Sequence, residues 1–338
     1  MQDSTLLSHP DRPTVYSVVI PVFNSAVALN ELTDRIRNVF CAFQSNYEII
    51  LVEDSGEESS WQAIQRLVGV DEKIRGFRLA RNYGQHNALL CGIRAARGDI
   101  IVTMDDDLQN PPEEMPRLLA KLDEGYDVVY GTPQKETHGI LRDMASRITK
   151  LALRGSMGAQ AAATISAFRA FRTNIRVSFQ DYRSPNVNID VLLTWGTTRF
   201  ASIKVRQDRR AHGQSGYTLP KLARHTFNML TGFSVLPLQV ASLLGLIFSL
   251  FGLFILAYVL LMYLIQGSSV AGFTFISSII SIFSGVQLFS IGVIGEYLAR
   301  IHFRTMDRPP YIVTEEAERD SVPLQHPLNR AAEDQMGS

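Results

Sequence analysis

Little in the composition of this 338-residue chain points to redox chemistry, a metal cluster or nucleic acid. The 33 basic and 33 acidic side chains cancel, so net charge gives no argument for a polyanionic partner, and we expect no nucleic acid to bind. The two cysteines, Cys41 and Cys91, match no metal-ligand spacing, and we expect both to be ordinary buried thiols. The first apolar run is not followed by a glycine-rich dinucleotide fingerprint, and no phosphate-cradling loop ends in Lys-Ser or Lys-Thr. Dinucleotide redox chemistry and ATP hydrolysis of the P-loop kind are therefore poorly supported.

The largest absence is of charge, because residues 226–295 contain no Asp, Glu, Lys, Arg or His. Within this stretch, 237–265 and 273–295 are each long enough to cross a bilayer, which takes about 20 apolar residues. A pair of buried core helices is the alternative, but we expect a transmembrane hairpin over 237–299. Basic residues flank both outer ends of this hairpin and are missing from its turn: Lys221, Arg224 and His225 precede it, and Arg300, Arg304 and Arg308 follow it. By the positive-inside rule, both termini of this multi-pass protein then lie in the cytosol.

Polar or amphipathic segments border the predicted hairpin. Residues 218–236 place spaced leucines and phenylalanines around a basic face, which is typical of an amphipathic helix lying in the membrane interface. Residues 1–14 carry no apolar signal-peptide core and are expected to be a flexible N-terminus. Residues 300–338 are expected to form a polar cytosolic tail, either flexible or loosely docked.

Strand-like and helix-like segments alternate through the first hundred residues. Apolar, β-branched runs predict strands at 15–22, 47–54, 74–80 and 99–107, and helical spacing predicts helices at 30–43, 60–69 and 85–98. This alternation favours an α/β fold, with a parallel sheet covered by helices, in a domain of residues 15–217. Ligands of such sheets bind beyond the carboxyl ends of the strands. The first, second and fourth runs end in "PVFN", "VEDS" and "DDDLQ", so polar residues stand where a ligand is expected.

Three consecutive aspartates, Asp105, Asp106 and Asp107, follow the fourth run. Mg²⁺ commonly binds through one or two carboxylates together with substrate phosphates. We therefore expect Asp105 and Asp107 to point towards one metal site, with a carbonyl oxygen from Gln109 and with Asp106 facing elsewhere. The alternative is a helix cap, in which Asp106 or Asp107 begins the helix after "NPP".

The segments "VVIPVFN", "ILVEDS", "RNYGQHNALLCGIRAARGD", "DDDLQNPPEE" and "RRAHGQSGYTLPKL", followed by two spans and "GEYLARI", carry a family resemblance. Together they resemble the family-2 glycosyltransferases that act on polyisoprenyl phosphates. That group includes dolichyl-phosphate mannose synthase and the bacterial undecaprenyl-phosphate glucose and aminoarabinose transferases. The resemblance covers residues 15 to 312 and is more specific for the family than for the sugar.

The resemblance implies a GT-A, Rossmann-like catalytic domain that binds Mg²⁺ or Mn²⁺ and a nucleotide-diphospho-sugar, with a UDP-sugar as the expected donor. It implies inversion at the anomeric carbon by direct attack of the lipid phosphate oxygen. The implied donor-side residues are Pro21, Phe23 and Asn24 around the nucleobase and ribose, Glu53 and Asp54 on the base or ribose, Asp105, Asp107 and Gln109 on the metal, and Asp106 beside the nucleotide.

On the acceptor side, Arg210, Ser215 and Tyr217 are suited to placing the lipid phosphate, since arginine binds phosphate oxygens in a bidentate manner. Asp107 and Arg210 are the expected catalytic residues. Lys221, with Arg224, could meet the lipid head group, or the two could form an ordinary juxtamembrane basic cluster. Arg169 is either an acceptor-side cation or an arginine that snorkels from a helix face.

Two positions depart from the family pattern: Ser25 replaces a common Glu, and Ala163 replaces a common Asp. We therefore assign no catalytic base. A catalytically impaired nucleotide-sugar-binding protein and a flippase or transport subunit stay open as alternatives. A processive polysaccharide synthase is disfavoured, because Trp61 and Trp195 lack a Gln-x-x-Arg-Trp context. We expect a homo-oligomer in the bacterial inner membrane.

Overall fold

The structure is a computed structural model that describes residues 14–134, 165–208, 236–266, 273–306 and 308–319. The chain divides into two compact units. Unit 1 comprises residues 1–136, 164–214 and 309–338, and unit 2 comprises residues 137–163 and 215–308. Several residues singled out from the sequence lie outside the described ranges, namely Ala163, Arg210, Ser215, Tyr217, Lys221 and Arg224, together with nearly all of the expected interfacial helix.

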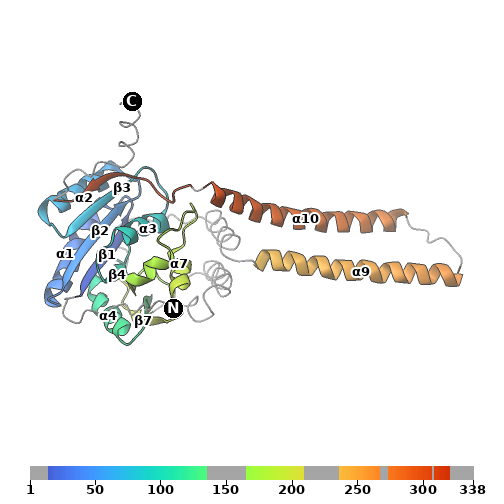
Figure 1. Cartoon of the computed structure of the whole chain (residues 1–338), viewed down its shortest axis with the longest axis horizontal. Coiled ribbons are helices and arrows are strands. Elements are labelled where there is room, and N and C mark those ends of the chain that lie inside the picture. The colour runs from blue at the N-terminus through green and yellow to red at the C-terminus, as the bar shows by residue number, and fades with distance from the viewer. Residues whose placement is uncertain (1–13, 135–164, 209–235, 267–272, 307, 320–338) are drawn as a thin grey trace, which may run out of the picture. The chain divides into compact units, whose positions relative to one another are not determined.

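The described residues of unit 1 form an eight-stranded sheet in the order β7-β5-β6-β4-β1-β2-β3-β8 (Figure 1). The strands are β1 (Val15–Val22), β2 (Asn46–Glu53), β3 (Ile74–Leu79), β4 (Ile100–Thr103), β5 (Val128–Pro133), β6 (Arg169–Arg172), β7 (Phe200–Val205) and β8 (Val313–Ala317). The helices are α1 (Ala26–Ala42), α2 (Glu58–Val70), α3 (Gln85–Ala95), α4 (Met115–Asp123) and α7 (Ile189–Gly196), with 3-10 turns η1 (Pro112–Glu114) and η2 (Thr173–Ser178). All four strands and all three helices expected in the first hundred residues are present.

The sheet is mixed rather than wholly parallel, which corrects the expectation from the sequence. β1 pairs in parallel with both β2 and β4, and β2 pairs in parallel with β3. β6 runs antiparallel between β4 and β5, and β8 runs antiparallel beside β3. β1 to β4 alternate with helices in the sequence, because a parallel pair needs a crossover connection, and β5 also pairs in parallel with β7. The two antiparallel additions come from distant segments that carry no such signal.

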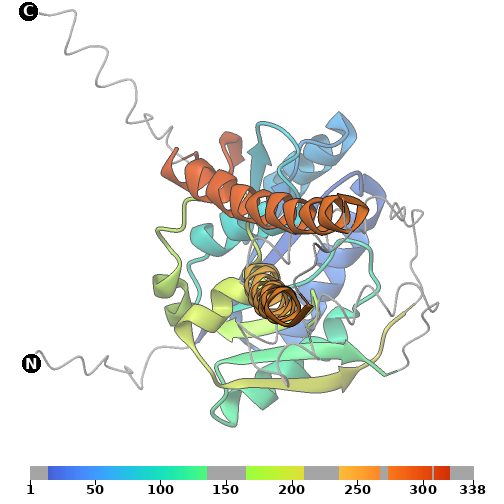
Figure 2. The same ribbon diagram turned by 90° about the vertical axis from the view of Figure 1, so that its right-hand side faces the viewer.

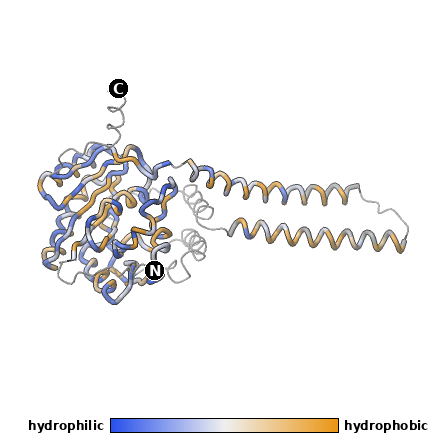
Figure 3. Tube along the Cα trace, in the orientation of Figure 1, coloured by the Kyte–Doolittle hydropathy of each residue, from blue (hydrophilic) through white to orange (hydrophobic). Residues whose placement is uncertain are grey.

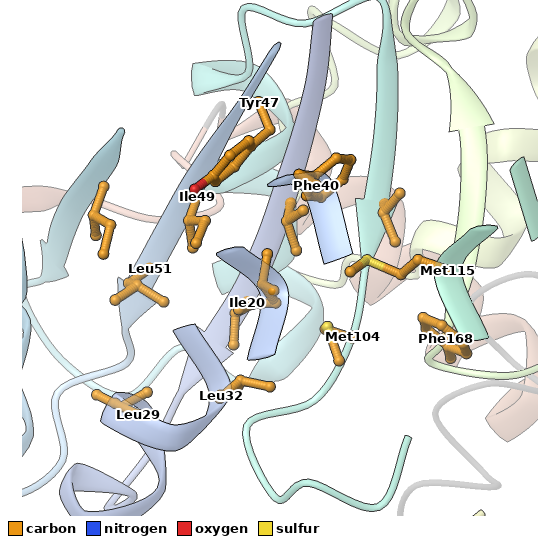
Figure 4. Close-up of a cluster of buried hydrophobic side chains, with 14 of the residues drawn as sticks. Ile20, Leu29, Leu32, Phe40, Tyr47, Ile49, Leu51, Met104, Met115 and Phe168 are labelled. Atoms are coloured by element: carbon orange, nitrogen blue, oxygen red, sulfur yellow. The ribbon is translucent and has the colours of Figure 1, made fainter. Parts of the chain in front are cut away.

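Alternate residues of the central strands face two separate cores, as the two-residue period of a strand requires. Val18 and Ile20 of β1 join a cluster with α1, α2 and α4, whereas Val19 joins a second cluster with α3 and α7. Figure 4 shows part of the first cluster, including Ile20, Leu32 and Phe40. Each fully buried Ile, Leu or Phe side chain contributes about 1.5–3 kcal/mol through removal of its apolar surface from water. Because helices cover both faces of the sheet, the ends of its strands remain uncovered.

Residues 313–317 of the predicted polar tail form a strand of the sheet, β8, which corrects the expectation that this part is flexible or loosely docked. β8 pairs with β3, and Glu315 accepts a hydrogen bond from the Trp61 indole (2.9 Å) and pairs with Arg78 (2.8 Å). Strand pairing satisfies the backbone groups that an edge strand otherwise exposes. Glu315 of β8 therefore pairs with a basic side chain of the neighbouring strand β3.

Unit 2 contains two long helices, α9 (Leu236–Gln266) and α10 (Phe273–Thr305), which pack against each other (Figures 1 and 2). Phe248 and Phe283 meet edge to face, with ring centroids 6.2 Å apart. One window, Leu238–Ile255, is long and apolar enough to cross a membrane, with a mean hydropathy of 2.2, and a shorter apolar stretch covers Phe283–Ala299. Figure 3 shows the apolar residues along both helices. α10 continues ten residues past the predicted end of the second span at residue 295.

The two cysteines differ in their surroundings. Cys91 of α3 is buried, and burial raises the pKa of its thiol to about 12. Cys41 of α1 is exposed, so the expectation that both thiols are buried was wrong for this residue. Position on the helix decides the difference, because Cys41 lies next to core-facing Phe40 but on the solvent side of the same amphipathic helix.

Candidate active site

The loops that leave the carboxyl ends of β1 to β4 share a backbone feature. Each contains a residue with positive φ: Asn24 (56°) after β1, Ser55 (51°) after β2, Gly84 (94°) after β3 and Leu108 (60°) after β4. Positive φ is uncommon for residues other than glycine and costs conformational energy, and such residues cluster at functional sites. The strained loops all lie at the edge of the sheet where ligands of α/β proteins bind.

An open pocket of about 260 Å³ lies at this edge. It is lined by Pro21, Val22, Phe23, Asp54, Asn82, Gly84, Gln85, Asp105, Asp106 and Asp107. Six of these ten residues were candidates from the sequence. The structure thus brings together the ends of β1, β2 and β4, as expected, and adds the β3–α3 loop.

Sequence analysis missed the contribution of that loop. Asn82, Gly84 and Gln85 line the pocket, yet no role was assigned to them. The signal was available, because the third strand also ends in a polar sequence, "RNYGQ", and its carboxyl end lies at the same edge as those of its parallel neighbours.

Nitrogen donors offset the repulsion among the three adjacent aspartates. Asp105 Oδ1 accepts a hydrogen bond from Gln85 Nε2 (2.5 Å), Asp106 Oδ2 from the Phe23 N–H (3.0 Å), and Asp107 Oδ1 from the Gln109 N–H (3.1 Å). Hydrogen bonds to ionised carboxylates are roughly twice as strong as neutral ones. All three carboxylates line the pocket, Asp106 included, so its place beside the nucleotide stays a prediction.

The surroundings of Asp106 perturb its pKa. Burial raises its pKa above the usual value, and the neighbouring charge of Asp107 raises it further, while the Phe23 N–H opposes the shift. Holding this carboxylate ionised in a metal-free pocket therefore costs free energy. A cation in the pocket would remove that cost.

The second strand ends in two carboxylates with different surroundings. Glu53 is 0% exposed; it accepts a hydrogen bond from the Gly56 N–H and lies 3.5 Å from Arg78 Nε. It does not line the pocket, so its expected contact with a base or ribose lacks support, and burial raises its pKa. Asp54 does line the pocket, but both of its oxygens accept backbone N–H groups, from Tyr83 and Gly84, at 2.7 Å each.

Asn24 acts between loops rather than on the pocket wall. Its Oδ1 accepts a hydrogen bond from the Glu57 N–H (2.7 Å), which joins the β1–α1 and β2–α2 loops. A Cβ at Gly56 would lie 2.3 Å from the same oxygen, so a larger residue there would displace the Asn24 side chain from this contact. The exposed Phe23 beside it lines the pocket and offers an aromatic face.

Gln109 lies just outside the pocket lining. Its backbone carbonyl accepts a hydrogen bond from the Asp208 N–H (2.9 Å). This contact fastens the chain after β7 to the acidic loop after β4. Asp105 and Asp107 are left as the first choices for holding a metal.

Arg169 lies in the protein interior. This buried position does not favour a role in binding the acceptor. Its side chain is 2% exposed, forms an ion pair with Asp190 and donates from Nε to Thr103 Oγ1 (3.0 Å). Tyr130 also donates to Asp190, at 3.1 Å. Because β6 runs through the middle of the sheet, its arginine meets buried partners and not solvent or membrane.

The pocket suits a hard divalent cation by the chemistry of its donors. Carboxylate oxygens are the ligands that Mg²⁺ and Mn²⁺ take, with phosphate oxygens completing the shell. Among the described residues, no group of three or more His, Cys, Asp or Glu forms a complete metal cage. Two aspartates with an open side fit a cation that arrives with a phosphate-bearing ligand.

Comparison with known proteins gives consistent matches. The model of the family described as "Glycosyl transferase family 2" matches residues 17–180. The undecaprenyl-phosphate 4-deoxy-4-formamido-L-arabinose transferase of Shewanella sediminis (strain HAW-EB3) is 33% identical over 310 residues, covering 91% of this chain and 94% of that protein. The enzyme of the same name from Pseudomonas aeruginosa (strain LESB58) is 33% identical over 318 residues, covering 93% and 94%. Among solved structures, the glucosyl-3-phosphoglycerate synthase of Mycobacterium tuberculosis with Mn²⁺, UDP and phosphoglyceric acid is 17% identical, with a TM-score of 0.48 over 64% of this chain and 76% of that one.

Proposed function

The chain belongs to glycosyl transferase family 2, and we propose that it moves a single sugar from a nucleotide-diphospho-sugar to undecaprenyl phosphate or a similar polyisoprenyl phosphate. Family membership makes it a glycosyltransferase. Relatives that match more than nine-tenths of the chain are named for transfer to undecaprenyl phosphate. In this chain the proposal is carried by one observation, the three aspartates that line an open pocket beyond β1 and β4.

The pocket supports the donor half of the reaction. Asp105 and Asp107 would hold Mg²⁺ or Mn²⁺, and the open side would receive the diphosphate. Phe23 is 48% exposed at the wall and offers a face on which a nucleobase can stack. The bound cation would neutralise charge that develops on the nucleotide diphosphate as it leaves.

The acceptor half needs placement more than proton transfer. A phosphate monoester is already ionised at neutral pH, so its oxygen can attack the anomeric carbon without a base. This single displacement, with the nucleotide diphosphate as leaving group, inverts the configuration at that carbon. Arg210, Ser215 and Tyr217 are proposed to hold this phosphate, and the neighbouring Lys221 to meet the lipid head group. All four residues lie outside the described ranges, and the proposal for them rests on the motif "RRAHGQSGYTLPKL".

The membrane part is proposed to bring this water-insoluble acceptor to a soluble donor. We propose that α9 and α10 both cross the bacterial inner membrane, with both termini in the cytosol. The uncharged stretch 226–295 and the basic flanks support this topology. An assembly of several copies through these helices stays a prediction.

The test uses purified full-length protein in detergent with undecaprenyl phosphate. Radiolabelled UDP- and GDP-sugars are supplied one at a time, beginning with UDP-linked 4-deoxy-4-formamido-L-arabinose. Organic-extractable label is measured with Mg²⁺, with Mn²⁺ and with EDTA. We expect label from one donor, dependent on the metal and reduced about 10²–10³-fold in Asp107→Ala, since this is the usual cost of removing an electrostatic stabiliser of the transition state.

Asp181→Ala provides the matched control, because Asp181 is an exposed aspartate outside the pocket. Its label should equal that of the unsubstituted protein. Binding of a nucleotide sugar without transfer from any donor would favour the impaired-enzyme alternative, and Ala163 would then be the first position to restore to Asp.

A further inference from the structure

One of the three nitrogen donors to the aspartates comes from a side chain. The Phe23 and Gln109 contacts use backbone N–H groups, whereas Asp105 is met by the Gln85 amide at 2.5 Å. A hydrogen bond on Oδ1 restricts the rotation of the Asp105 carboxylate. Carboxylates that bind metals are commonly fixed in this way by a donor that does not itself touch the metal.

The loop that precedes Gln85 is held in place by the carboxylate of Asp54. It begins α3, directly after Gly84, whose φ of 94° turns the chain into the helix. The Gly84 and Tyr83 N–H groups both donate to Asp54, one to each oxygen, at 2.7 Å. Asp54 is 4% exposed, so this clamp is shielded from water on most sides.

The far side of the loop is fastened as well. The buried Asn87 donates from Nδ2 to the backbone carbonyl of Pro310 (2.5 Å) and to that of Pro185 (3.1 Å). At the other end of the loop, the Ala80 N–H donates to the Ile312 carbonyl (2.9 Å). The segment that runs into β8 therefore holds the β3–α3 loop at both of its ends.

We propose that Gln85 is a positioning residue for the metal, aimed by Asp54 through the β3–α3 loop so that Asp105 is oriented before the cation and donor arrive. This proposal rests on the proposed function, because it assigns a role within the same metal site. It also gives Asp54 a task different from the expected contact with base or ribose: Asp54 acts through the loop.

The test compares Gln85→Met with the unsubstituted full-length protein in detergent. Methionine keeps the length of the side chain but removes the donor, and Gln85 is exposed, so folding should be unaffected. Gln65→Met, at an exposed position on α2, is the matched control. Mn²⁺ binding is measured by electron paramagnetic resonance, with Mn²⁺ alone and with Mn²⁺ plus UDP.

We expect Gln85→Met to bind Mn²⁺ about 10–100-fold more weakly, the usual effect of losing an outer hydrogen-bond partner of a metal ligand. The KM for Mn²⁺ in sugar transfer should rise by a similar factor, while kcat at saturating Mn²⁺ changes much less. The control should match the unsubstituted protein in all three quantities. A merely structural role for Gln85 would lower the melting temperature without this split between KM and kcat.

A second variant, Asp54→Asn, tests the clamp by hydrogen exchange at the Tyr83 and Gly84 amides. An asparagine side chain presents an NH₂ group to one of these N–H donors, so we expect faster exchange there together with weaker Mn²⁺ binding. Unchanged Mn²⁺ affinity in Gln85→Met, in a protein that otherwise binds Mn²⁺ and transfers sugar, would overturn the positioning role alone. Failure of the unsubstituted protein both to bind Mn²⁺ and to transfer sugar would overturn the proposed function, and this inference with it.

Discussion

Removal of either member of the buried Arg169–Asp190 pair should destabilise unit 1 severely. Arg169 is 2% exposed and Asp190 is 5% exposed, so neither charge is solvated once its partner is gone. The substitution Arg169→Met leaves the Asp190 carboxylate with Tyr130 as a donor, and Asp190→Leu leaves the guanidinium with Thr103. Neither remaining partner carries an opposite charge.

The size of the effect follows from the cost of an uncompensated buried charge. Breaking such a pair costs about 3–5 kcal/mol, whereas replacing both members by apolar residues is often neutral. For a domain of 150–250 residues, each kcal/mol shifts Tm by about 2–4 °C, so each single variant should lose roughly 6–20 °C. The double variant Arg169→Met, Asp190→Leu should recover most of that loss.

Tryptophan fluorescence during thermal unfolding of the full chain in detergent measures this effect. Both tryptophans, Trp61 and Trp195, lie in unit 1, so the signal reports on the unit that carries the pair. Arg117→Met, which breaks an exposed pair with Glu114, is the control and should cost less than about 1 kcal/mol. An unchanged Tm in Arg169→Met, combined with a raised KM for the lipid phosphate, would refute this reasoning and restore Arg169 as an acceptor-side cation.

Two further substitutions test the pocket and the packing of the sheet. In metal-free protein, Asp106→Asn should raise stability at pH 7.5 by about 0.5–2 kcal/mol, as replacement of a destabilised active-site charge often does. The sign of this effect follows from the raised pKa of Asp106 in the folded protein, because its ionisation lowers the stability as pH rises through that pKa. The gain in Asp106→Asn should therefore disappear in thermal scans near pH 4. A gain that persists at pH 4 would contradict this explanation. Gly92→Ala should cost about 1–3 kcal/mol, because its Cβ would lie 2.3 Å from Val19 Cγ1 between α3 and β1. Urea titrations measure both glycine substitutions. Gly69→Ala, in α2 with open space around it, should be stabilising by about 0.5–1 kcal/mol, and equal effects of the two substitutions would show that the contact with Val19 does not matter.

Local sequence patterns were sufficient for the parallel half of the fold. Apolar runs and helical spacing predicted β1 to β4 and α1 to α3, because each of those elements buries a continuous face that its own residues define. The predicted fourth strand ran to Asp107, whereas β4 ends at Thr103. The difference lies in the three aspartates, which turn out of the strand to line the pocket.

Contacts between distant segments were not visible in the same patterns. β8 has two adjacent glutamates, Glu315 and Glu316, that suit a solvated tail, and the contacts of Glu315 with Arg78 and Trp61 help to explain why it pairs with β3. Arg169 likewise looks like a surface cation in the sequence. Its burial depends on Asp190, which lies 21 residues away and contributes the opposite charge.

The sequence by itself determined the polar strand ends, the three aspartates and the uncharged stretch 226–295, because residue type and spacing alone specify oxygen ligands and apolar length. Tertiary structure decided which of the strand-end residues share a pocket. Glu53 and Asp54 are adjacent in the chain, yet successive side chains at a strand end point in different directions, so one is buried beneath a turn and the other lines the pocket. Gln85 reaches Asp105 across 20 residues of sequence because β3 and β4 end at the same edge of one sheet.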